Sequence, residues 1–288
     1  MSAIAYITDS KMLELHRLNN HKTINFWRVS TNVNFSDFSV GDLVFFLSKD
    51  KEHRNKTEKG IVGFGRLKDV TVASIRTMWN KYGIYNGYAT LNEFKEAILK
   101  VSKNMKLPSK ISSFYLENVT FFQPVYLSEC GVHISSSTES FVYLKDTDVV
   151  LKLLDLAKKS DDLWSSLTGN RESIELEEAV FSLFAVHREI KDIKMSETAS
   201  RRAKRELRSY KELHKGFEFI HDSSSELYKI DGNEITVVFY HDRSVDDKLL
   251  IGQASLYTEE LNDLLDYRYR IDFKTSDHDR KLENHLNA

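Results

Sequence analysis

Two carboxylates in the second half of the chain have a spacing that suits a metal ion. Asp231 and Glu234 flank a Gly-Asn pair in the stretch DGNEIT, and Thr236 stands where a catalytic lysine would be wanted. Paired carboxylates can hold a magnesium ion for phosphodiester cleavage. Asp-Gly-Asn is equally the sequence that a tight turn requires. The pair therefore leaves two interpretations open, a nuclease site with Mg2+ and a hairpin turn.

A second group of side chains could bind phosphate. The segment 196–216, SETASRRAKRELRSYKELHKG, is rich in basic residues. Residues 188–215 contain ten Lys and Arg against five Asp and Glu, whereas residues 220–288 contain eight against fifteen. Cations on one helix face can neutralise phosphates without reading sequence. The alternatives are a solvated face with ion pairs along the helix and docking onto the acidic C-terminal segment, from the same chain or a second subunit. The candidate phosphate ligands are Arg201, Arg202, Lys204, Arg205 and Arg208.

The third candidate is an aromatic residue in a strand-like run. Trp27, one of only three tryptophans, lies in INFWRVS at residues 24–30. Side chains alternate along a strand, so Phe26 and Trp27 face opposite ways. We assign Phe26 to the core, and Trp27 either to the core or to the wall of a pocket for a flat ligand. The same alternation predicts that only one of Phe45 and Phe46 is buried.

Composition excludes several kinds of site. A single cysteine, Cys130, excludes an internal disulfide and a Cys-based zinc site. No apolar run approaches the roughly 20 residues that cross a bilayer, and the start MSAIAYITDSKML has no signal-peptide pattern. We therefore expect a cytoplasmic protein with no membrane partner. A net charge of -2 gives no global attraction to nucleic acid, so any basic surface must be local. Gly-Phe-Gly at 63–65 lacks the context of a phosphate loop, and its glycines predict a bulge or a close backbone approach.

The elements that must position these residues change character near residue 158. Before it, strand-like runs are separated by turns, with one helix at 90–103 whose Thr90 and Glu93 have capping-box spacing. Helical patterns follow at 173–194 and 196–215. Three strand-like runs then precede an acidic tail, and DGN joins the last two as a hairpin. We expect an α+β protein with two domains: residues 1–158 as a β-barrel with flanking helices, and residues 159–288 as a helical plus β-hairpin domain.

The order of the early runs resembles a known family. INFWRVS, FSVGDLVFFLSK, GIVGFGRL, MWNKYGIYNGYATLNEFKEAI and FFQPVYLSECGVHISSSTESFVYL follow one another as in the N-terminal PUA-like domain of HNH-type restriction endonucleases. That domain is related to the EVE and YTH domains. The resemblance covers about residues 1–158, and its most specific part is the aromatic-Gly-x-x-Asn-Gly block at residues 82–87, followed by a helix.

The resemblance implies a small barrel that receives a base, often a modified one, flipped out of nucleic acid into an aromatic pocket. Unstacking a base costs a few kcal/mol, and an aromatic face returns about 1 to 3 kcal/mol per base. In this interpretation Trp27 is a wall, and Asn25 and Ser30 hydrogen-bond a base edge. The residues that would close the other side are Trp79, Tyr82, Tyr85 and Tyr88.

An HNH nuclease would also need a histidine-rich metal site. The candidate histidines, His187, His214, His221 and His241, are scattered, which departs from the family pattern, so we assign no metal site and no cofactor, with Mg2+ only if the chain is a nuclease. The first hypothesis is a reader of a modified or flipped base in DNA, serving restriction or anti-phage defence. The alternatives are a modification-dependent endonuclease with a divergent C-terminal metal site and an RNA-binding protein. The expected partner is DNA, including modified DNA, with RNA less favoured; a homodimer or an effector subunit is also considered.

Overall fold

The chain forms two compact units, Ser2–Glu177 and Glu178–Ala288. The computed structural model describes residues 3–32, 35–52, 58–134, 140–160, 170–190 and 197–288. The division between the units falls within helix α6 (Asn170–Ile190), whereas the composition changes near residue 158. The assignment of separate roles to residues 1–158 and 159–288 stays a prediction.

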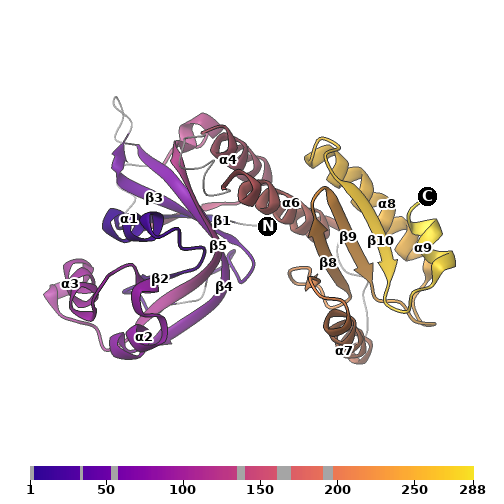
Figure 1. Cartoon of the computed structure of the whole chain (residues 1–288), viewed down its shortest axis with the longest axis horizontal. Coiled ribbons are helices and arrows are strands. Elements are labelled where there is room, and N and C mark those ends of the chain that lie inside the picture. The colour runs from indigo at the N-terminus through magenta and orange to yellow at the C-terminus, as the bar shows by residue number, and fades with distance from the viewer. Residues whose placement is uncertain (1–2, 33–34, 53–57, 135–139, 161–169, 191–196) are drawn as a thin grey trace. The chain divides into compact units, whose positions relative to one another are not determined.

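A six-stranded sheet forms the centre of the first unit, in the order β2-β5-β4-β3-β1-β6 (Figure 1). β1 and β3 are parallel, and the other neighbours are antiparallel. The strands are β1 (Ala3–Thr8), β2 (Ile24–Arg28), β3 (Leu43–Glu52), β4 (Lys59–Ala73), β5 (Ile111–Val125) and β6 (Phe141–Leu144). The helices are α1 (Ser10–Leu18), α2 (Ile75–Tyr82), η1 (Gly83–Asn86), α3 (Leu91–Val101), η2 (Lys103–Met105), η3 (Leu127–Cys130) and α4 (Thr147–Lys159).

The described strands curve but do not close into the expected barrel, because β2 and β6 remain edges of the sheet. Register shifts in the β3–β4 and β4–β5 pairings bend the sheet. The bend brings β1 and β2 together across its concave face, where the ring centroids of Tyr6 and Phe26 lie 5.0 Å apart. Gly63 sits at one shift, and a Cβ there would lie 2.6 Å from the carbonyl oxygen of Thr120. The predicted close backbone approach is therefore confirmed.

Strand alternation is confirmed in β2 and fails in β3. Phe26 is buried and stacks on Phe46, whereas Trp27 is half-buried and faces the other way. The prediction that only one of Phe45 and Phe46 is buried is wrong, since both are fully buried. β3 is an inner strand with both faces covered: Phe45 contacts Phe64 on one face, and Phe46 lies against Phe26 on the other. The alternation of side chains along a strand predicts an exposed side chain only where one face of the sheet is open to solvent.

The second unit contains a four-stranded sheet in the order β10-β9-β8-β7. β7, β8 and β9 are antiparallel, and β10 runs parallel to β9. Residues 247–286 fold into α8, β10 and α9, so the expectation of an acidic tail is wrong. The elements are α7 (Glu197–Leu213), β7 (Glu218–Phe219), β8 (Glu226–Asp231), β9 (Glu234–Phe239), α8 (Asp247–Leu264), β10 (Arg270–Thr275) and α9 (Arg280–Leu286).

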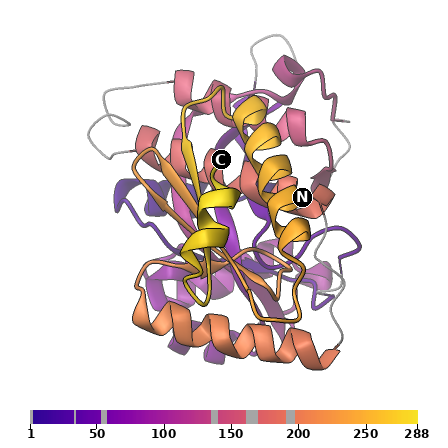
Figure 2. The same ribbon diagram turned by 90° about the vertical axis from the view of Figure 1, so that its right-hand side faces the viewer.

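Helices cover both faces of this second sheet. Leu207 of α7 packs with Val238 of β9 in one hydrophobic cluster. Phe239, the next residue of β9, points to the other face, where Tyr257 of α8 contacts it and Phe273 of β10. Figure 2 shows α8 and α9 side by side. The unit is therefore a helix–sheet–helix sandwich, in which α7 has one buried side and one exposed side.

Two local predictions are confirmed. The DGN turn joins β8 to β9, with Asp231 paired to Glu234 and Gly232 at a φ of 56°. Thr90 caps α3 by accepting a hydrogen bond from the backbone N–H of Glu93. The last residues of the helical pattern at 173–194 lie outside the described residues. None of the described helices combines the length and the apolar composition that crossing a membrane requires.

A buried ion pair attaches the start of α6 to the first sheet. The guanidinium of Arg66 on β4 contacts the carboxylate of Glu177, with side chains 6% and 1% exposed. Asn118 donates a hydrogen bond of 2.7 Å to the other oxygen of Glu177. Removing one partner of a buried pair leaves an uncompensated charge, which costs far more than the intact pair contributes.

We expect Glu177→Ala to lower the free energy of unfolding of the first unit by about 3 to 5 kcal/mol. All three tryptophans lie within residues 2–177, so their fluorescence during urea unfolding measures this unit. The control is Glu117→Ala, which breaks the exposed pair with Lys68 and should cost less than about 1 kcal/mol. Equal losses in the two variants would contradict the assignment.

Candidate functional site

One face of β2 meets the turn after α2 and the start of α3 in a group of aromatic and amide side chains. The ring of Trp27 lies 5.6 Å from that of Phe94 and 6.2 Å from that of Tyr88. Trp79 joins the group through Phe94, at 5.9 Å. We call this group the β2 cluster; its members are Asn25, Trp27, Trp79, Asn86, Tyr88 and Phe94.

A chain of amides fixes which atoms of the β2 cluster are available to a ligand. Asn86 donates from Nδ2 to the carbonyl of Gly83 at 2.7 Å, which directs its Oδ1 toward Asn25. Asn25 must then donate from Nδ2, at 2.8 Å. Its Oδ1 is left as a buried acceptor, and the indole Nε1 of Trp27 is a buried donor; neither has a hydrogen-bond partner in the described part of the chain. Both side chains belong to the same face of β2.

The turn that carries Asn86 is tightly held. Gly87 has a φ of 89°, and a Cβ on it would lie 2.2 Å from Cγ of Met12, so another residue would not fit. Tyr88 donates a hydrogen bond of 2.8 Å to Asp9. Burial and the nearby Asp9 carboxylate raise the pKa of Tyr88, so its hydroxyl remains a neutral donor. These contacts keep the amide of Asn86 in place against β2.

His16 on α1 is a neighbour of this turn that the sequence analysis missed. It is fully buried, its Nδ1 lies 2.9 Å from Nδ1 of His21, and its Nε2 has no hydrogen-bond partner among the described residues. Burial, and then the charge of His21, lower the pKa of His16 to about 3. His16 is therefore neutral near pH 7. A single histidine on an amphipathic helix gives no signal in the sequence that distinguishes it from a surface residue.

The predicted pocket residues divide into two groups. Asn25, Trp27, Trp79 and Tyr88 lie in the β2 cluster. The other three lie outside it. Tyr82 stacks on Tyr115 at 5.6 Å, Tyr85 is 41% exposed and lies beside His21, and Ser30 is exposed beyond the end of β2, where its hydroxyl accepts from the N–H of Asn32. Whether any of the seven binds a base stays a prediction.

The five predicted phosphate ligands all lie exposed on α7. Arg202 forms an ion pair of 2.6 Å with Asp242, and Arg201 contacts Glu197. The remaining three, Lys204, Arg205 and Arg208, are exposed on the side of the helix away from its buried stripe or, for Lys204, at the flank of that stripe.

The predicted carboxylate pair lies at the tip of the β8–β9 hairpin. The Asp231 side chain is 76% exposed and lies 2.9 Å from Nζ of Lys229. This hydrogen bond lowers the pKa of Asp231. Glu234 is the opposite residue of the hairpin, and its carboxylate accepts a 3.4 Å hydrogen bond from Thr236. The requirements of a tight turn explain both positions, and a role for them in cleavage stays a prediction.

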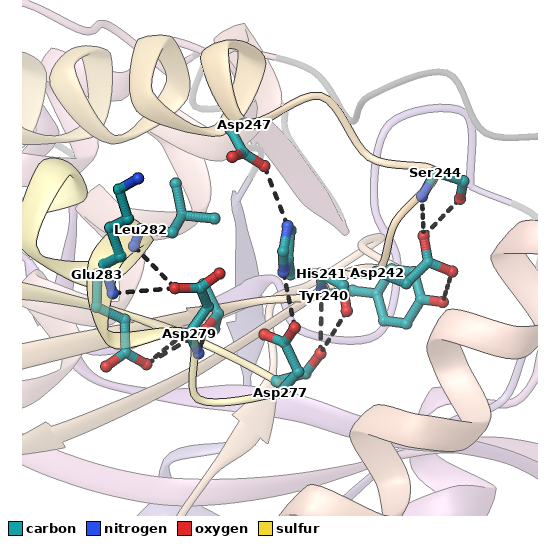
Figure 3. Close-up of polar contacts among 12 residues, drawn as sticks. Tyr240, His241, Asp242, Ser244, Asp247, Asp277, Asp279, Leu282 and Glu283 are labelled. Carbon is teal, nitrogen blue, oxygen red and sulfur yellow. Dashed lines mark hydrogen bonds and ion pairs between the residues drawn. The ribbon is translucent and has the colours of Figure 1, made fainter.

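A histidine held between two carboxylates lies where the parallel strands β9 and β10 end (Figure 3). Nδ1 of His241 lies 2.9 Å from Asp277, and its Nε2 lies 3.1 Å from Asp247 at the start of α8. The next residue, Asp242, accepts hydrogen bonds from Tyr240 and Ser244. Because both ring nitrogens face carboxylates, His241 fits this site as an imidazolium that donates twice. It joins β9, α8 and the turn after β10.

The other histidines that were considered for a metal site, and not assigned to one, have contacts of their own. His187 lies 2.7 Å from the hydroxyl of Tyr257 and from the carboxylate of Glu226. His214 packs against Tyr210. Among the described residues, no three His, Cys, Asp or Glu side chains are grouped so that they could hold a metal ion.

Comparison with known proteins gives matches among solved structures. No family model matches the chain, and no curated protein matches it. The ASCH protein of Zymomonas mobilis is similar to it, at 13% identity and a TM-score of 0.38, over 54% of this chain and 94% of that chain. Two single-substitution variants of the same protein give TM-scores of 0.39 and 0.38 at 13% identity, over 54% of this chain and 95% and 97% of theirs. Similarity at this level does not establish a family.

We expect His241 to stabilise the second unit in a pH-dependent way. Burial alone would lower the pKa of His241, but the hydrogen bonds to Asp277 and Asp247 raise it above its usual value near 6.5. A raised pKa means that the stabilisation is complete below about pH 6.5 and is lost as the pH rises through the folded value. His241→Gln should therefore destabilise the chain more at pH 6 than at pH 9 in urea unfolding followed by circular dichroism. The prediction would be refuted if the loss of unfolding free energy in His241→Gln does not change with pH. It would also be refuted if the exposed control His285→Gln shows the same change with pH.

Proposed function

We propose that the chain binds nucleic acid and that its first unit holds one unpaired base at the β2 cluster. The observation that carries this proposal is the pair of buried polar atoms on β2, the acceptor Oδ1 of Asn25 and the donor Nε1 of Trp27, which have no described partner. A buried polar atom without a partner costs about 1 to 3 kcal/mol. A ligand that carries both a donor and an acceptor is the kind that could satisfy these two atoms. The Watson–Crick edge of every nucleobase carries both, and that edge is free only when the base is unpaired.

The surroundings of these atoms also suit a flat ligand. Trp27, Trp79, Tyr88 and Phe94 supply aromatic surface, and stacking on such rings stabilises a bound base by about 1 to 3 kcal/mol. Trp27 and Trp79 are only half-buried, so part of this surface reaches solvent. The two polar atoms themselves are covered, and entry of a base must therefore displace side chains of the β2 cluster.

For the polymer we propose DNA, and for the base a modified one, in a role in restriction or anti-phage defence. This part of the proposal rests on the resemblance of residues 1–158 to PUA-like domains. A methyl group on the base would add apolar contact to an aromatic site, worth about 0.8 kcal/mol. RNA is the alternative, because unstacked RNA bases are held by the same combination of stacking and edge hydrogen bonds.

We expect Trp27→Ala to weaken binding of the preferred oligonucleotide by about 1 to 3 kcal/mol, or roughly 5- to 150-fold. Fluorescence anisotropy with a labelled oligonucleotide that carries one unpaired or modified base would measure this. Trp27→Phe is the matched variant, since it keeps an aromatic ring but removes the N–H donor and part of the ring surface. Its affinity should fall between those of the unchanged chain and Trp27→Ala. Circular dichroism must show that both variants are folded. Unchanged affinity in a folded Trp27→Ala protein would contradict the base site.

The nature of the polymer follows from the same measurement. The affinity of the unmutated chain is measured for DNA and RNA oligonucleotides of identical sequence, each carrying the same base change, and the two affinities are compared. Tighter binding of the DNA supports the proposal. A preference for RNA would move the assignment to an RNA-binding protein while leaving the base site intact.

The endonuclease alternative makes a separate prediction. We expect the unchanged chain, Asp231→Ala and Glu234→Ala all to leave DNA uncut, because Asp231 is paired with Lys229 at an exposed hairpin tip. The measurement is incubation of the full chain and both variants with modified phage DNA and magnesium, followed by electrophoresis. Cleavage by the unchanged chain that disappears in both variants would replace the reader by a nuclease.

A further inference from the structure

We infer that the exposed face of α7 binds the phosphate backbone of nucleic acid and does not read its bases. The surface consists of four basic residues, which we call the α7 stripe: Arg201, Lys204, Arg205 and Arg208. It lies in the second unit and is independent of the β2 cluster. The inference rests on the proposed function only for the identity of the polyanion as a nucleic acid.

The spacing of the α7 stripe places its cations on one side of the helix. Its residues stand at i, i+3, i+4 and i+7, which share one face of an α-helix. All four are exposed. Arg201, Arg205 and Arg208 lie opposite the buried side of the helix, formed by Ala203, Leu207 and Tyr210, and Lys204 lies at the flank of that side. At a rise of 1.5 Å per residue the stripe is about 10 Å long, enough to follow several phosphates along a duplex or a single strand.

The arrangement is unfavourable for a helix face that is merely solvated. Arg201 and Arg205, and likewise Lys204 and Arg208, are like-charged pairs at i,i+4. Such pairs destabilise a helix, by about as much as opposite charges at this spacing stabilise it, roughly 0.2 to 0.5 kcal/mol each. A polyanion that lies along the stripe would relieve both repulsions.

The fifth candidate, Arg202, is excluded from this surface by its own contact. It lies about 100° around the helix from Arg201, and its guanidinium is 2.6 Å from the carboxylate of Asp242. That carboxylate also accepts a 2.6 Å hydrogen bond from the hydroxyl of Tyr240. Arg202 therefore attaches α7 to the end of β9 and is directed away from the stripe.

The neighbours of the α7 stripe define what it can bind. Arg201 contacts Glu197, but both side chains are about 80% exposed, and a surface pair of this kind contributes only about 0 to 1 kcal/mol. A phosphate can therefore replace Glu197. Glu212 follows Arg208 at i+4 and ends the basic face. Neither the stripe nor its exposed neighbours Ser209 and Glu212 is aromatic, so the surface offers no ring for a base to stack on. Binding there should be blind to sequence.

The test is the salt dependence of binding of the full chain to a mixed-sequence DNA duplex without modified bases. The slope of log K against log salt concentration measures the number of phosphates that are neutralised, at about 0.9 per contact on duplex DNA. We expect Lys204→Gln, Arg205→Gln and Arg208→Gln each to reduce the slope by about this amount. The matched control is Arg202→Gln, on the same helix and with the same loss of charge, which should leave the slope unchanged.

The inference would be overturned if the duplex does not bind at low salt, if the slopes of the stripe variants are unchanged, or if Arg202→Gln reduces the slope as much as they do. A polyglutamate peptide that binds as tightly as the duplex would instead assign the surface to an acidic protein and also overturn it. The β2 cluster is tested separately by base dependence at fixed salt. Trp27→Ala should abolish base preference and keep the slope, so failure of one proposal is distinguishable from failure of the other.

Discussion

The alternation of side chains along β2 is the constraint on which the proposed base site depends. Because Phe26 is committed to the core between the two halves of the curved sheet, its neighbours Asn25 and Trp27 must face the opposite side. There the turn at Asn86 meets them, and its amide, fixed by the carbonyl of Gly83, determines that Asn25 presents an oxygen. One strand therefore stabilises the fold with one face and leaves a donor and an acceptor on the other. A one-residue shift in register would remove both functions together.

The two units offer different chemistry to a nucleic acid. The β2 cluster has aromatic rings and a donor–acceptor pair, which suits a base, whereas the α7 stripe has cations and no exposed ring, which suits phosphates. Backbone contacts supply affinity that falls with salt, and base contacts supply selectivity. The net charge of -2 does not show this division, because the acidic residues after α7 offset the cations of α7. One of these acidic residues, Asp242, forms the ion pair with Arg202.

Local patterns in the sequence predicted local structure, and the failures arose where distant segments meet. Thr90 and the DGN turn act over a few residues, and both appear as expected. The open sheet, the burial of both Phe45 and Phe46, and the fold of the C-terminal segment depend on which strands become neighbours, which alternation does not encode. At the site, the residue types selected Trp27 and Asn25. The residue types could not predict the burial of His16 or the ion pair between Arg202 and Asp242, forty positions later, because these contacts form only when the chain folds.

The proposed base site requires that the indole N–H of Trp27 donates to a bound base, and nuclear magnetic resonance can detect that bond. The chain has three tryptophans, so its 15N-labelled indole spectrum is simple, and the Trp27→Phe protein identifies the Trp27 resonance. We expect this resonance to move downfield when an oligonucleotide with one unpaired or modified base is added, and to stay in place with a fully paired, unmodified duplex. An unshifted Trp27 resonance in a chain saturated with the unpaired or modified oligonucleotide would rule out the base site.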